Sequence, residues 1–124
     1  MKVAVIGSRS CAGLHVSQMI SCLPGGCSEI VSGGAVGIDS IAQAASHVLN
    51  VPIKIFLPKF QEYGKSAPLM RNIQIIEYSD IVLAFWDMHS SGTKQVIAEC
   101  IRRGKPFRII PLDPHPKHSQ SNNE

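Results

Sequence analysis

The sequence predicts an α/β fold, in which a single parallel five-stranded sheet has helices on both faces. Two observations lead to this prediction. Five short apolar runs alternate with four segments whose apolar residues recur at helical spacing, a pattern typical of βαβ units. The runs are apolar throughout instead of alternating with polar residues, which is typical of strands buried on both faces.

Length and composition are those of one domain. The chain has 124 residues, of which 44% are hydrophobic, and domains commonly hold about 100–150 residues. We expect the folded domain to span residues 1–111. The remaining segment, 112–124, is rich in proline and polar residues, so we expect a disordered tail.

Charge and hydropathy restrict the partners. No segment approaches the ~20 apolar residues of a membrane span, and the apolar run 3–6 is shorter than the roughly 7–15 residues of a signal peptide core. We therefore expect a cytoplasmic protein without a membrane partner. The net charge of +3 is compatible with an anionic ligand, but it is too small and dispersed to indicate nucleic acid by itself.

The cysteines and histidines indicate neither a disulfide nor a metal site. The four cysteines include no C-x-x-C pair, and Cys100 lies on an apolar helical face typical of the core. His115 and His118 stand in the expected tail, which is too loose to hold a metal. We predict reduced thiols, no metal and no cofactor.

In the first half of the chain, strands are expected over residues 3–6, 29–32 and 53–57. Helices are expected over 16–23 and from 38 to about 50. Pro24 and the two glycines after it end the first of these helices, and Pro58 stops the third strand.

In the second half, residues 58–66 show no clear period. Phe60 and Tyr63 make this segment a candidate lid over a site, or a surface loop held by aromatic packing. Ser66 and Pro68 are typical of a helix start, so a helix should follow, with strands over 81–86 and 107–110. A further helix, between these strands, should end at the basic residues before Gly104.

Three loops rich in glycine, serine or threonine each follow a strand and precede a helix, at residues 7–10, 33–37 and 87–93. Right-handed crossovers make 3-2-1-4-5 the simplest strand order, a Rossmann-like doubly wound sheet. Ligands of such sheets bind beyond the carboxyl ends of the strands, where the winding reverses between the first and fourth strands. The three loops should therefore meet at one crevice.

The glycine turn is suited to a phosphate. Gly33, Gly34 and Gly37 allow positive φ and close approach of a ligand, and the following helix offers free N–H groups. The glycine spacing matches neither the dinucleotide fingerprint nor the Walker P-loop. Taken alone, the turn is equally compatible with a tight connection that has no ligand.

Residue types then give the candidate site. Arg9 and Arg71 are the cations best placed to grip phosphate oxygens. Asp39 could bind ribose hydroxyls or serve only as a helix-dipole carboxylate, and Phe85 and Trp86 are expected in the core more than against a base. No catalytic residue is assigned. The predicted ligand- and phosphate-binding residues are Gly7, Ser8, Arg9, Ser32, Gly33, Gly34, Gly37, Asp39, Arg71, Asn72, Ser91, Gly92 and Thr93.

These motifs, taken in order, resemble those of the SLOG superfamily, which groups DNA-processing protein A with the Lonely Guy phosphoribohydrolases. The resemblance spans residue 1 to about 111 and is greatest to small stand-alone bacterial and phage members. It rests on Val5-Ile6-Gly7-Ser8-Arg9, on Val31-Ser32-Gly33-Gly34-Ala35-Val36-Gly37-Ile38-Asp39, on Arg71-Asn72, and on Ser91-Gly92-Thr93 after Ala84-Phe85-Trp86-Asp87.

The resemblance implies a nucleotide or nucleotide-derived ligand at the glycine loops and a homo-oligomer. The phosphoribohydrolases carry a glutamate three residues after the threonine, where this chain has Val96. An alternative function is a nucleoside monophosphate N-glycosidase, with Asp39, Asp87 or Glu99 as the acid/base residue. A second alternative, from the likeness to DNA-processing protein A, is a single-stranded DNA-binding accessory protein of recombination.

Overall fold

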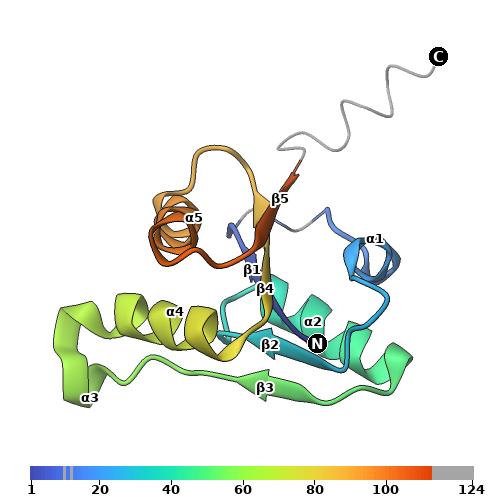
Figure 1. Cartoon of the computed structure of the whole chain (residues 1–124), viewed down its shortest axis with the longest axis horizontal. Helices are drawn as coiled ribbons and strands as arrows, with labels where there is room; N and C mark the ends of the chain where they lie inside the picture. Colours follow the sequence, from blue (N-terminus) through green and yellow to red (C-terminus); the bar gives the residue numbers. More distant parts are fainter. Residues whose placement is uncertain (10, 12, 113–124) are drawn as a thin grey trace.

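The computed structural model describes residues 1–9, 11 and 13–112. It contains one parallel five-stranded sheet of order β3-β2-β1-β4-β5 (Figure 1), which confirms the predicted fold class and strand order. The tail expected after residue 112 lies outside the described residues. The strands are β1 (Lys2–Gly7), β2 (Glu29–Ser32), β3 (Ile53–Ile55), β4 (Ile81–Trp86) and β5 (Phe107–Pro111).

The helices follow the predicted ranges closely, with one exception. They are α1 (Val16–Cys22), α2 (Ile38–Leu49), α3 (Phe60–Tyr63), α4 (Ala67–Tyr78) and α5 (Ser91–Arg103), with a 3-10 turn η1 (Gly64–Ser66). The prediction of an irregular segment over 58–66 was wrong, because α3 and η1 occupy most of it. A single helical turn is too short to show a hydrophobic period.

Helices cover both faces of the sheet, as predicted. Alternate residues of the buried strands point to opposite faces, so Val3 and Val5 pack with α1 and α2 while Ala4 packs with α4 and α5. Each face has a buried apolar cluster, with Phe85 and Ile75 completely buried on opposite sides. No helix in the described part of the chain is long and apolar enough to cross a membrane.

Strand β1 lies between β2 and β4 and therefore pairs on both edges. Val3 is in register with Ile30 of β2 and with Ile81 of β4. Two hydrogen bonds join the start of β1 to the residue before β4. Lys2 N donates to Asp80 Oδ2 (2.7 Å), and Asp80 N donates to Lys2 O (2.8 Å). The carboxyl ends of β1, β2 and β4 consequently lie at one edge of the sheet.

All four cysteines are free thiols, and Cys100 is completely buried. Burial raises the pKa of Cys100 from its ordinary value of 9.0 to about 11. The stability that this shift contributes is fully present below pH 9 and is lost as the pH rises towards 11, because the unfolded thiol ionises first. We expect wild type to lose about 2 kcal/mol more stability than Cys100→Ala across this interval, measured by urea unfolding.

Equal pH slopes in the two proteins would contradict that expectation. A thiol reagent checks the same burial at neutral pH. It should modify the half-buried Cys22 and Cys27 while the chain is folded, and Cys11 and Cys100 only after unfolding.

Candidate functional site

Ser8 joins the loops that follow β1 and β4. Its N–H donates to the Phe85 carbonyl (3.0 Å), and its hydroxyl oxygen accepts from the N–H of Asp87 (3.1 Å). The side chain is buried, with 2% of its surface exposed. Ser8 therefore holds two of the three predicted loops together and does not present its hydroxyl freely to a ligand.

Glycines bring the loop after β1 against the glycine turn after β2. A Cβ at Gly7 would stand 3.0 Å from the side chain of Ile38 at the start of α2. Gly37 has a φ of 89°, and a Cβ there would stand 3.1 Å from Cys11 Sγ and 3.9 Å from the Arg9 carbonyl oxygen. The three loops thus converge, as their order in the sheet predicts.

Arg71 reaches this edge of the sheet from α4. Its guanidinium donates from Nη1 to the carbonyl oxygen of Gly33 and from Nε to Asn72 Oδ1 (2.8 Å). Partial burial lowers the pKa of Arg71, because desolvation disfavours the charged form. Within residues 1–9, 11 and 13–112, no carboxylate pairs with Arg71, since the ion pairs found there belong to Arg102 and Arg103. Carbonyl and amide oxygens, and no described carboxylate, therefore hold this charge in place.

Glycine is required where Arg71 meets the turn. A Cβ at Gly33 would lie 2.8 Å from Arg71 Nη1 and 3.0 Å from its Cδ, so any side chain would displace the guanidinium. Gly34 has a φ of 72°, and a Cβ there would meet Leu57 Cδ2 at 2.6 Å. Gly33 therefore lets the Arg71 guanidinium approach, while Gly34 allows the backbone to turn.

Asp39 is engaged by neighbours in the sequence. The Ser32 hydroxyl donates to Asp39 Oδ1 (3.0 Å), and Gln43 Nε2 donates to Asp39 Oδ2 (2.6 Å). Ser32 itself is completely buried. These contacts brace the end of β2 against the first turn of α2, which favours the helix-start interpretation of Asp39 over ribose binding.

The Asp87 carboxylate holds the loop after β4 together. Asp87 Oδ1 accepts from the N–H groups of His89 (2.9 Å) and Ser90 (2.8 Å), and Oδ2 accepts from the Ser90 hydroxyl (2.9 Å). Because the Ser90 hydroxyl donates to Asp87, it does not cap α5, and no other side chain within the described chain does so. The helix begins at Ser91, so Gly92 and Thr93 belong to its first turn and offer N–H groups there.

The side chains flanking this loop face inward. Thr93 is buried, with 3% of its surface exposed, so the N–H groups of its turn are better placed for a ligand than its hydroxyl. Phe85 is completely buried, and Trp86 Nε1 donates to the Ser90 carbonyl (3.0 Å). Both aromatics thus have structural contacts, as the alternation of the strand predicts.

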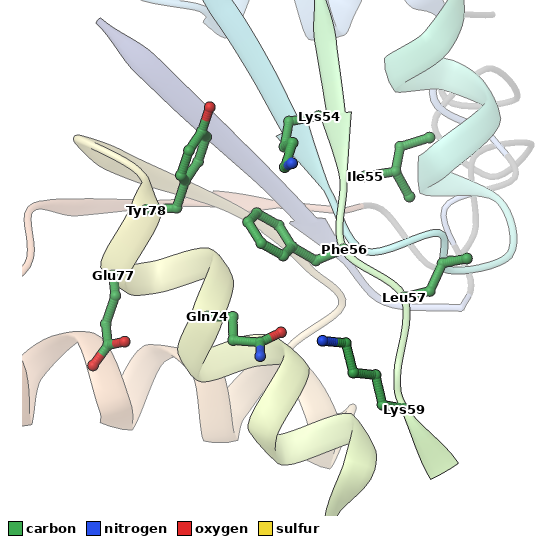
Figure 2. Close-up of a pocket in the computed structure, with 8 residues that line it drawn as sticks. All are labelled: Lys54, Ile55, Phe56, Leu57, Lys59, Gln74, Glu77 and Tyr78. Atoms are coloured by element: carbon green, nitrogen blue, oxygen red, sulfur yellow. The ribbon is translucent and has the colours of Figure 1, made fainter. Parts of the chain in front are cut away.

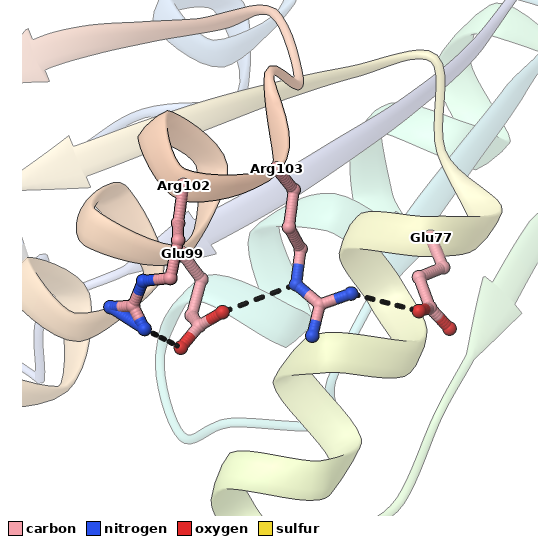
Figure 3. Close-up of polar contacts among 4 residues, drawn as sticks. All are labelled: Glu77, Glu99, Arg102 and Arg103. Atoms are coloured by element: carbon pink, nitrogen blue, oxygen red, sulfur yellow. Dashed lines mark hydrogen bonds and ion pairs between the residues drawn. The ribbon is translucent and has the colours of Figure 1, made fainter.

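Glu99 lies away from the converging loops. It accepts from Arg102 Nη1 (2.9 Å) and Arg103 Nε (3.1 Å), and Arg103 also pairs with Glu77 of α4 at 2.9 Å (Figure 3). This network lies near the end of α5, where Lys105 Nζ donates to the carbonyl of Ser79, just before β4 begins (2.6 Å). Glu99 is therefore at the amino edge of the sheet and joins two helices, so the structure does not support its candidacy as an acid/base residue.

A surface groove of about 560 Å³ lies between the end of β3 and α4 (Figure 2). Its floor is aromatic: the rings of Phe56 and Tyr78 meet edge to face at 5.4 Å, and Tyr78 donates to Glu29 Oε1 (2.8 Å). None of the predicted ligand-binding residues lines it. Sequence reasoning missed the groove because its lining comes from elements whose contact only the fold creates. The lining residues are Lys54, Ile55, Phe56, Leu57, Lys59, Gln74, Glu77 and Tyr78.

Comparison with known proteins adds no relative: protein-family models, curated proteins and solved structures were each searched without a significant match to the chain.

Proposed function

We propose that this protein binds a nucleotide or nucleotide-derived small molecule, and that the ligand's phosphate lies against the loops after β1, β2 and β4. Arg71 is the observation that carries the proposal. A partly buried cation costs free energy unless an anion compensates it, and no carboxylate does so within the described residues. The guanidinium has more N–H donors than its contacts with Gly33 and Asn72 use.

The backbone around Arg71 supports the same ligand chemistry. Gly34 and Gly37 have positive φ, and α2 and α5 both begin at this edge with no side-chain cap from their described N-cap residues. Uncapped helix starts offer N–H groups and a partial positive charge to phosphate oxygens. Arg9 is exposed at the same place and adds a second cation.

The nucleotide part of the proposal rests on the resemblance to the SLOG superfamily. We favour binding over N-glycoside cleavage, because Val96 stands where the phosphoribohydrolases have a glutamate and Glu99 is held at the other end of α5. The two other candidate acids, Asp39 and Asp87, are both engaged in hydrogen bonds that shape their loops.

A thermal-shift panel tests the proposal. It contains inorganic phosphate, nucleotides, nucleotide sugars, cyclic nucleotides and short single-stranded DNA. A ligand at 100 times its Kd adds about 2.7 kcal/mol, which corresponds to a rise in Tm of roughly 10 °C for a chain of this size. We expect such a shift with one mononucleotide class. A shift with oligonucleotides alone would favour the DNA-binding alternative, and no shift with any compound would contradict both.

A double variant locates the site. Arg9→Ala with Gly34→Asp removes a cation and places a carboxylate where phosphate should lie, so the ligand shift should disappear. The control is Arg108→Ala with Gly25→Asp, which makes the same changes of charge at exposed positions. Gly25 has no atom near its added Cβ, whereas Gly34 has Leu57 close by, so circular dichroism must show that both double variants are folded. Loss of the shift in the control alone would place the site elsewhere.

A further inference from the structure

Among the described residues, no strand lies beside the outer edge of β3 (Figure 1). On its inner edge, Phe56 N donates to Ser32 O (2.9 Å) and Ile30 N donates to Pro52 O (3.0 Å). Main-chain groups alternate in direction along a strand, so residues 52, 54 and 56 face β2. Ile53, Ile55 and Leu57 consequently direct their N–H and C=O groups outward.

β3 is short and carries Lys54, and both features limit pairing at an edge, but its outward N–H groups are all present. Pro52 and Pro58 stand at inward-facing positions, so neither removes an outward N–H, and Lys54 is the one charged residue from 53 to 57. Exposed apolar side chains also gather here. Of the ten large hydrophobic side chains that are exposed among the described residues, six fall between residues 36 and 60, in and around α2 and β3: Val36, Val48, Leu49, Ile55, Leu57 and Phe60.

We infer that β3, extended by Phe56 and Leu57, pairs antiparallel with the same segment of a second copy of this chain, about a two-fold axis at Ile55. An antiparallel pair centred there sets Ile55 opposite Ile55 of the second copy and Ile53 opposite Leu57 of the second copy. Each of these residues has its main-chain groups directed outward, so every such pair exchanges hydrogen bonds. The two sheets join into one continuous sheet, and the unpaired edge is removed.

The side chains match under the same symmetry. Ile53 and Ile55 of β3 share one face with Leu57 just beyond it, and together they form an apolar row across the two copies. On the other face, Lys54 lies opposite Phe56 of the second copy, so the two lysines are never directly opposed. Within one chain, Lys54 Nζ already lies 5.4 Å from the centre of the Phe56 ring, which shows that this ring accepts a cation.

The complementarity of this strand with itself is what selects a second copy as the partner. A strand of unrelated sequence would need to match an apolar row and a lysine–aromatic pair by chance. The reversed direction also brings the segment after β3, with the exposed Phe60, towards the end of α2 of the second copy, where Val48 and Leu49 are exposed. Apolar surface of both copies is removed from water there.

Sedimentation or light scattering of the full chain tests this interface. Wild type should show twice the chain mass of 13.4 kDa. Ile55→Lys and Ile55→Glu each oppose like charges across the axis and should give monomers. Mixing the two variants opposes Lys to Glu, so dimers should return, which misfolded proteins would not produce.

The control is Ile101→Lys, an equally polar change at an exposed isoleucine of α5, 65% of whose surface is accessible. This variant should remain dimeric. A monomeric wild type at all concentrations, dimers in both single Ile55 variants, or folded variants that stay monomeric when mixed would each overturn the inference. Circular dichroism of every variant establishes that it is folded.

Discussion

Arg71→Ala should weaken the binding of a phosphate-bearing ligand by about 100-fold or more. The guanidinium is partly desolvated and fixed by Gly33 and Asn72, so its hydrogen bonds to a phosphate are strong and preorganised. Hydrogen bonds that involve a charged group contribute about 1.5–3 kcal/mol each, and a bidentate contact makes two of them. Isothermal titration of wild type and variant, with the nucleotide class identified by thermal shift, measures the change.

Two further variants separate charge from geometry. Arg71→Lys keeps the charge but loses the planar fork, so it should recover only part of the affinity. Arg108→Ala removes an exposed arginine of β5, and its affinity should stay within a few-fold of wild type. Equal loss in the Arg71 and Arg108 variants would show that net charge, and not a defined site, attracts the ligand.

Ile75→Ala should lower the free energy of unfolding by about 2–5 kcal/mol. Ile75 is completely buried on α4, in the cluster that includes Ala4, Val31 and Val82 of the sheet. Truncation of the Ile75 side chain leaves a cavity between α4 and the sheet. Since native domains are stable by only about 5–15 kcal/mol, much of the total is lost, and Tm should fall by roughly 10 °C or more.

Ile101→Ala is the matched control for that measurement. It makes the same substitution inside a helix, at a residue 65% of whose surface is accessible. Its free energy of unfolding should stay within about 0.5 kcal/mol of wild type. Comparable losses at both positions, in urea unfolding followed by circular dichroism, would mean that Ile101 is buried in an assembly or that Ile75 is not in the core.

The fold was predictable because each pattern had one interpretation. Uniformly apolar runs such as 81–86 mark buried strands, and the connections between them leave few possible strand orders. The boundaries were less accurate, because α3 is one turn long and the first turn of α5 is built from Ser91, Gly92 and Thr93, which equally suit a loop.

The location of the candidate site could be predicted from the sequence better than the role of each residue in it. Strand order alone brings the three loops to one edge. It says nothing of hydrogen-bond partners, so the engagement of Asp39 by Ser32 and Gln43 was not foreseen. Glu99 stood among the alternatives because it is near Thr93 in the sequence, but nearly two helical turns carry it towards the opposite edge of the sheet.

The central position of β1 has a consequence for the order in which the protein can assemble during synthesis. β1 leaves the ribosome before the other four strands, yet β4, which pairs with one of its edges, follows about 78 residues later, since Val3 pairs with Ile81. Until then the nascent chain holds an apolar strand with one open edge. The first half of the fold must wait for the second, and a translational pause before residue 81 would prolong its exposure to aggregation and to chaperones.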